Sequence, residues 1–158
     1  MPKLSAGILL YRWTKNKPEV FLVHPGGPFW AKKDTGAWSI PKGEHTESED
    51  SLLAAKREFK EETGRNCPEG EYLLLGEVKY GNKKVTAWFT ENDFDKDIRS
   101  NFFEMEWPLK SGEKQRFPEV DRAGWFSLDV ARRKLVKGQT PFVDMLAEQV
   151  TQNQTSLF

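Results

Sequence analysis

The chain has 158 residues, with 24 Lys and Arg balanced by 24 Asp and Glu, so its formal net charge is zero. This balance disfavours a strongly basic nucleic-acid-binding protein, and an aromatic content of 13% excludes a disordered chain. No apolar run approaches the roughly 18 residues of a membrane span, and no signal peptide is expected. With Cys67 as the single cysteine, we expect one globular domain over residues 1–158 in the cytoplasm.

The first part of the chain predicts a β-hairpin followed by a long loop. Residues 4–13 and 20–23 are rich in strand-forming side chains, and a turn at residues 15–18 separates them. Residues 24–36 are dense in Gly and Pro, and long loops of this kind in compact domains often carry function. A short strand is predicted at residues 38–40.

The clearest helix is predicted over residues 51–63, which contain no Gly or Pro and are followed by Gly64. Thr46 with Glu49 three residues later has the capping-box pattern that precedes helices. An apolar stripe that includes Phe59 should face the core.

The rest of the chain alternates strands, one irregular stretch and helices. We expect strands at residues 72–79 and 84–90, an irregular segment at 92–117, a strand at 125–126, and helices at 127–135 and 141–150. Together these elements predict an α/β (α+β) fold in which a mixed β-sheet is sandwiched between α-helices.

Three carboxylates share one sector of the predicted helix. Glu58, Glu61 and Glu62 are spaced i, i+3 and i+4, and like charges at this spacing repel by a few tenths of a kcal/mol per pair. A divalent cation such as Mg²⁺ or Mn²⁺ would remove that repulsion, because hard cations prefer carboxylate oxygens. The alternative is a solvated acidic face offset by neighbouring Lys and Arg, and the helix alone leaves both interpretations open.

The residues around this helix resemble the Nudix box. Gly43, Glu49 and the octapeptide from Arg57 to Gly64 recur at the intervals of that motif, although Arg65 stands where the family usually has an aliphatic residue. The arrangement of the preceding strand and a Glu six residues before Trp125 are also similar. The chain therefore resembles the Nudix hydrolases of the MutT type, and its pattern is nearest to the diadenosine polyphosphate branch.

The resemblance implies the Nudix fold and an activity. It implies a Mg²⁺- or Mn²⁺-dependent pyrophosphohydrolase that cleaves a phosphoanhydride bond in a nucleoside diphosphate linked to another group. The expected substrate is a small nucleotide, either a dinucleoside polyphosphate or a nucleoside triphosphate. The alternatives are a non-catalytic nucleotide-binding module, which would usually lack the box glutamates, and an enzyme acting on an RNA 5′ end.

Roles for individual residues follow from the resemblance. The implied metal ligands are the carbonyl of Gly43 and the carboxylates of Glu58, Glu61 and Glu62, while Arg57 would hold the carboxylates in place with Glu49 as its partner. The general base is left open between a box glutamate such as Glu61 and a later loop glutamate. Glu119 is the preferred loop candidate, and its rivals are Glu104, Glu106 and Glu113.

Four residues are candidates for binding the substrate. Lys42 is placed to meet phosphate oxygens as a point charge, and His24 could contact phosphate or only cap a turn. Trp30 and Tyr80 lie on or beside loops, where a base could stack on them for roughly 1–3 kcal/mol.

Overall fold

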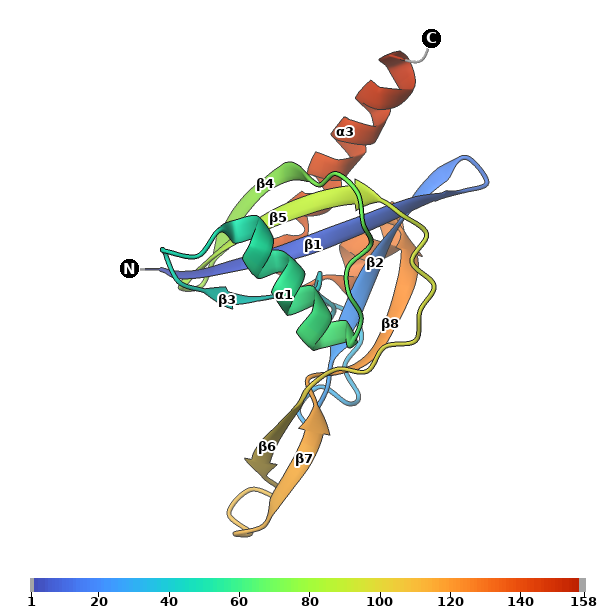
Figure 1. Cartoon of the computed structure of the whole chain (residues 1–158). Coiled ribbons are helices and arrows are strands. Elements are labelled where there is room, and N and C mark those ends of the chain that lie inside the picture. Colours follow the sequence, from blue (N-terminus) through green and yellow to red (C-terminus); the bar gives the residue numbers. More distant parts are fainter. Residues whose placement is uncertain (1, 157–158) are drawn as a thin grey trace.

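The fold is built on a mixed six-stranded β-sheet with helices on both faces (Figure 1). The computed structural model describes the backbone of residues 2–156 and the side chains of residues 2–151. In this part of the chain no helix is long and apolar enough to cross a membrane. The elements in chain order are β1 (Lys3–Thr14), β2 (Lys17–Pro25), β3 (Lys42–His45), α1 (Ser51–Thr63), β4 (Leu73–Tyr80), β5 (Lys83–Glu91), β6 (Phe102–Glu106), β7 (Lys114–Pro118), β8 (Val120–Ser127), α2 (Leu128–Lys134), the short 3₁₀ helix η1 (Lys137–Gln139) and α3 (Pro141–Ser156).

Strand β1 is the centre of the sheet, whose order is β4-β5-β1-β2-β8. One edge of β1 pairs in parallel with β5, while the other pairs antiparallel with β3 near its start and with β2 near its end. Lys15 and Asn16 both have positive φ and form the two-residue turn between β1 and β2. The predicted first hairpin is therefore confirmed.

Two apolar cores flank the sheet. Helix α1 covers one face, where Ala55 and Phe59 pack with Ile8 of β1. Helices α2 and α3 cover the opposite face, where Phe142 and Leu146 belong to the second core (Figure 1). This arrangement confirms the predicted mixed sheet between helices.

Helix α1 has the predicted bounds, but a different residue caps it. Asp50 is the N-cap, and its carboxylate accepts a hydrogen bond of 3.0 Å from the Leu53 N–H. The predicted capping box of Thr46 and Glu49 is therefore wrong, because the chain makes one further turn before the helix begins. Gly64 ends the helix in the left-handed region, with φ of 73°.

The strand predicted at residues 38–40 is also wrong. Trp38 and Ser39 form only isolated bridges, to Leu135 and Val23 respectively, and the strand that joins the sheet is β3. Alternating apolar residues are absent from β3, so its sequence gave no strand signal.

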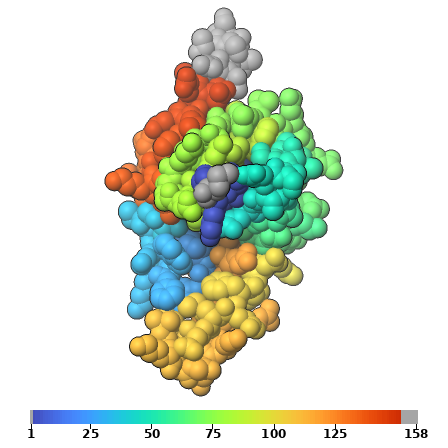
Figure 2. Space-filling model, turned by 90° about the vertical axis from the view of Figure 1, so that its left-hand side faces the viewer, coloured from blue at the N-terminus to red at the C-terminus, as the bar shows by residue number. Residues whose placement is uncertain are grey.

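The segment predicted as irregular at residues 92–117 contains a further hairpin, in addition to β1–β2 and β4–β5. β6 and β7 pair antiparallel and project from the body of the molecule, and the loop before Trp38 lies beside the base of this projection (Figures 1 and 2). The rings of Phe29 and Trp107 join the loop to the hairpin, with centroids 5.5 Å apart. The next strand, β8, begins at Val120, well before the predicted 125–126.

Candidate active site

Gly43 on β3 lies directly against Glu58 on α1. A Cβ atom at position 43 would come within 2.0 Å of the Glu58 carboxyl group. β3 is held in this position by β1, where Gly43 pairs with Ala6. Because a side chain would fill the gap, glycine is what allows the strand and the helical carboxylate to approach each other.

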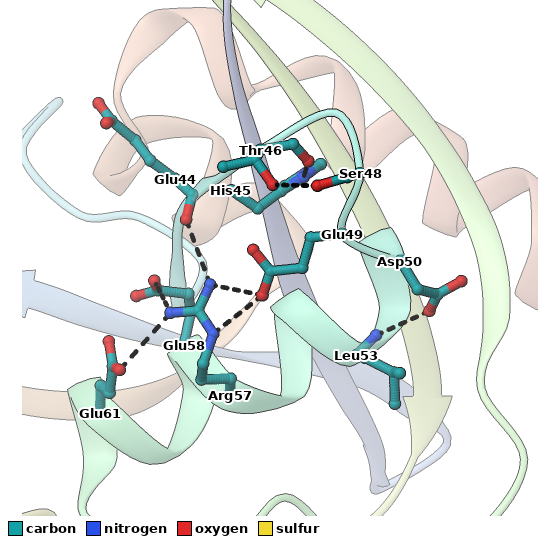
Figure 3. A network of polar contacts seen from close by, with 10 residues as sticks. All are labelled: Glu44, His45, Thr46, Ser48, Glu49, Asp50, Leu53, Arg57, Glu58 and Glu61. Atoms are coloured by element: carbon teal, nitrogen blue, oxygen red, sulfur yellow. Dashed lines mark hydrogen bonds and ion pairs between the residues drawn. The ribbon is translucent and has the colours of Figure 1, made fainter.

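Arg57 ties the acidic residues of this region together (Figure 3). Its Nη2 atom donates to Glu49 Oε2 at 2.9 Å, and its Nη1 atom donates to Glu58 Oε1 at 2.7 Å. The same Nη1 atom lies 3.5 Å from Glu61 Oε1. The guanidinium therefore holds three carboxylates at once, and Glu49 is part of this network in place of a helix cap.

Glu62 lies one helical turn after Glu58, and its carboxyl group is mostly buried against β3. Its Oε1 atom accepts a hydrogen bond of 3.1 Å from the backbone N–H of Lys42. The pKa of Glu62 is raised to about 8, chiefly by burial; the hydrogen bond and charge of Lys42 act against this rise, and the charges of Glu119 and Glu58 add to it. In this environment the carboxyl group is stabilised either by keeping its proton or by binding a cation.

Backbone hydrogen bonds bring Glu119, which lies much later in the sequence, close to helix α1. The Asn101 N–H donates to the Glu61 carbonyl at 2.9 Å, and the Glu119 N–H donates to the Asn101 carbonyl at 2.8 Å. The Gly26 N–H donates to the Glu119 carbonyl. Partial desolvation, followed by the charge of Glu61, raises the pKa of Glu119.

The donor set fits a hard divalent cation. Burial, followed by the charge of Glu61, also raises the pKa of Glu58, while Arg57 lowers it. A cation would therefore stabilise the ionised form of both Glu58 and Glu62. In residues 2–151, however, no three carboxylate, His or Cys side chains already converge on one point. The oxygen atoms of Glu58, Glu61 and Glu62 are nevertheless of the kind that hard divalent cations prefer.

A pocket of about 330 Å³ opens beside the carboxylates. Lys42 and Glu62 line it near the helix, and Glu119 lines it from the start of β8. Trp30 and Tyr80, which the sequence analysis proposed as stacking surfaces, line the same pocket. The structure thus brings together five of the candidate residues, while Glu104, Glu106 and Glu113 lie on the β6–β7 hairpin outside the pocket lining.

His24 lies outside this group of residues. Its side chain is fully buried, Nδ1 is 2.8 Å from Asp121 Oδ1, and Nε2 is 2.6 Å from the Lys33 carbonyl oxygen. Both ring nitrogens are therefore engaged within the protein. His24 anchors the start of the long loop, and we leave it out of the proposed substrate contacts.

Gln139 is a pocket residue that no sequence pattern predicted. It is fully buried in η1 and lines the pocket together with Ser39. A glutamine in a three-residue helix between two longer helices belongs to no recognisable motif, so no sequence pattern could have singled it out.

Comparisons with known proteins agree with this geometry. The model of the NUDIX domain family matches residues 1–146. The chain is 30% identical over 102 residues to the 8-oxo-(d)GTP phosphatase of Mycolicibacterium smegmatis. That match covers 62% of this chain and 26% of the relative, so the chain matches about a quarter of that protein's length.

Two solved structures illustrate the shared fold. A binary complex of the C. elegans Ap4A hydrolase superposes with a TM-score of 0.63 at 21% identity, covering 95% of this chain and 98% of that one. The NUDIX domain of Shewanella oneidensis NrtR, solved with ADP ribose, superposes with a TM-score of 0.62 at 17% identity, covering 95% and 89%. At these identities the likeness establishes the fold.

Proposed function

Because this chain belongs to the Nudix hydrolase family, we propose that it is a Mg²⁺- or Mn²⁺-dependent pyrophosphohydrolase acting on a dinucleoside polyphosphate or a nucleoside triphosphate. The observation that carries the proposal is the gathering of glutamates from α1 and from Glu119 beside one pocket. A non-catalytic binding module would usually lack the box glutamates, and this chain keeps all of them.

Each residue of the cluster has a proposed role. Glu58, Glu62 and the carbonyl of Gly43 would hold the cation, with Glu61 as a further candidate ligand. When bound, the cation neutralises phosphate charge and lowers the pKa of a bound water. Arg57 keeps the carboxylates in position through the contacts described above, and the Lys42 ammonium adds a positive charge for the phosphates.

Glu119 is the proposed general base. It lines the pocket with Glu62, whereas its three rivals on the hairpin do not. Its raised pKa also suits the role, because a base works best when its pKa lies near the pH at which the enzyme operates.

We expect Glu119→Gln to lower kcat by about a hundredfold, because positioned proton transfer typically contributes 10²–10⁴ in rate. The loss should shrink at alkaline pH, where hydroxide replaces the missing base, and Mn²⁺ affinity should change little. Steady-state kinetics across pH, with Glu113→Gln as the matched control, test this role. A Glu119→Gln enzyme with normal kcat would remove Glu119 from the reaction.

The pocket favours a long polyphosphate with a base at its end. Lys42 and Lys83 supply positive charge along it, and Trp30, with 37% of its surface exposed, offers a ring for stacking. A tetraphosphate bridge can use several of these charges at once, while the second ribose of ADP-ribose cannot. The similarity to an Ap4A hydrolase supports this substrate class. ADP-ribose, which is bound in the NrtR structure, is the alternative substrate.

A hydrolysis panel tests the proposed function. We expect activity that a chelator abolishes, and a higher kcat/KM for dinucleoside tetraphosphates than for ADP-ribose. Lys42→Ala should lower kcat/KM more for the tetraphosphate than for ADP-ribose, while Lys17→Ala, at the distant β1–β2 turn, should change neither. A tenfold preference for ADP-ribose would overturn the substrate class, and hydrolysis unaffected by chelator would overturn the metal-dependent reaction. The panel should include 5′-triphosphorylated RNA as the third substrate class.

A further inference from the structure

Gln139 fixes the direction of a hydrogen bond in the pocket. Its Oε1 atom accepts from the backbone N–H of Ile40 at 3.0 Å. A backbone N–H can only donate, so the amide oxygen must face Ile40 and the amide nitrogen must face away from it. Nε2 therefore donates both of its hydrogens, to Ser39 Oγ at 2.9 Å and to the hydroxyl oxygen of Tyr80 at 3.1 Å.

The hydrogen bond from Gln139 limits where the hydroxyl hydrogen of Tyr80 can point. Its oxygen already accepts from Gln139, so its hydrogen has to point elsewhere. Among the residues whose side chains the structure describes, none accepts that hydrogen, and Tyr80 lines the pocket. Tyr80 therefore offers a hydrogen-bond donor to whatever occupies the pocket.

The position of Tyr80 is built into the fold. A Cβ atom at position 138 would come within 2.2 Å of the Tyr80 ring, so the ring lies directly on the backbone of Gly138. Tyr80 also pairs with Lys83 where β4 meets β5, and Lys83 lines the same pocket as a second donor. The backbone of Gly138 therefore fixes the ring, the strand pairing fixes the backbone of Tyr80, and the buried amide of Gln139 holds the hydroxyl group.

We propose that Tyr80, oriented by Gln139, reads an acceptor oxygen on the nucleobase and so selects 6-oxo purines over adenine. The inference rests on the proposed function for its substrate class. Val23, Ala37 and Val136 line the pocket with Trp30, which suits a base better than a phosphate. An amino group placed against Tyr80 would meet a donor, and a site built to donate rejects a partner that cannot accept.

Inosine and adenosine nucleotides with the same phosphate chain provide the test. They differ at the 6-oxo or 6-amino group and in the protonation of the adjoining ring nitrogen. We expect wild-type protein to prefer the inosine compound by at least about fivefold, both in kcat/KM and in the calorimetric affinity for methylene-bridged analogues that resist hydrolysis. The preference should appear in KM rather than in kcat, because the base lies away from the reacting phosphate.

Variants separate the donor from the residue that positions it. Tyr80→Phe keeps the ring and should bring the inosine-to-adenosine ratio close to one. Gln139→Met should also lower the ratio, since a freed hydroxyl can rotate and accept from an amine, but it should have no further effect in the Tyr80→Phe background. Tyr72→Phe, whose hydroxyl donates to the Pro68 carbonyl, is the matched control and should leave the ratio unchanged.

The outcomes distinguish this inference from the proposed function. A wild-type ratio near one, or a preference that survives Tyr80→Phe, overturns the reading of the base by Tyr80. Equal losses for both nucleotides in Tyr80→Phe would assign the hydroxyl to ribose or phosphate and also overturn it. Oxo-selective binding without hydrolysis of any nucleotide would defeat the proposed function alone, and failure to bind either nucleotide would defeat both.

Discussion

Glu58→Gln and Glu62→Gln should each lower kcat by at least about a hundredfold, as loss of key charge stabilisation in an active site commonly costs 10²–10³ in rate. Each change removes a proposed cation ligand. Neither removes a core contact, and glutamine at position 62 can still accept the hydrogen bond from the Lys42 N–H. The folded state should therefore survive, as circular dichroism and thermal melting would show.

The matched control for these variants is Glu104→Gln, which removes a carboxylate from the exposed β6–β7 hairpin. It should leave kcat unchanged. Near-normal turnover in either Glu58→Gln or Glu62→Gln, measured at saturating Mg²⁺, would contradict the assignment of these carboxylates.

The second large effect concerns stability in the absence of divalent cations. With its pKa raised to about 8, folded Glu62 keeps its proton at a pH where the unfolded chain, with a glutamate pKa of about 4.3, has released it. The unfolded state then binds fewer protons, so the free energy of unfolding falls as pH rises between about 4.5 and 8. The shift corresponds to a loss on the order of 3–5 kcal/mol over this range.

Glu62→Gln should remove this part of the pH dependence. Denaturant unfolding in chelator, at about pH 5 and about pH 8, should show the variant losing less stability than wild type, with Glu104→Gln behaving like wild type. Added Mn²⁺ should restore stability to wild type at the higher pH, because a ligand that binds only the folded state stabilises it. Identical pH profiles of stability for wild type and Glu62→Gln would mean that Glu62 is not the carboxyl group responsible for this pH dependence.

Local signals account for the parts of the structure that the sequence predicted. The run from Ser51 to Thr63 contains no helix breaker and is followed by a glycine, so α1 has its predicted bounds. The motif spacing placed Gly43 and the helical glutamates next to each other, because both lie within one short strand–loop–helix unit. Elements whose structure is determined by residues close together in the sequence were therefore predictable.

Long-range contacts account for what the sequence did not predict. β3 carries polar side chains and is a strand only because β1 offers it an edge. Glu119 reaches the helix through Asn101, a backbone connection that no spacing reveals. Gln139 lines the pocket because η1 packs beside β4. This contact joins two parts of the chain that are about 60 residues apart in the sequence.

We propose that the α1 glutamates form a divalent-cation site, and direct Mn²⁺ titration tests this proposal. Electron paramagnetic resonance follows free Mn²⁺ as protein is added, for wild type, Glu62→Gln and Glu104→Gln, without reference to turnover. We expect wild type and Glu104→Gln to bind Mn²⁺ with the same affinity and Glu62→Gln to bind it at least about tenfold more weakly. Equal Mn²⁺ affinity in all three proteins would contradict the claim.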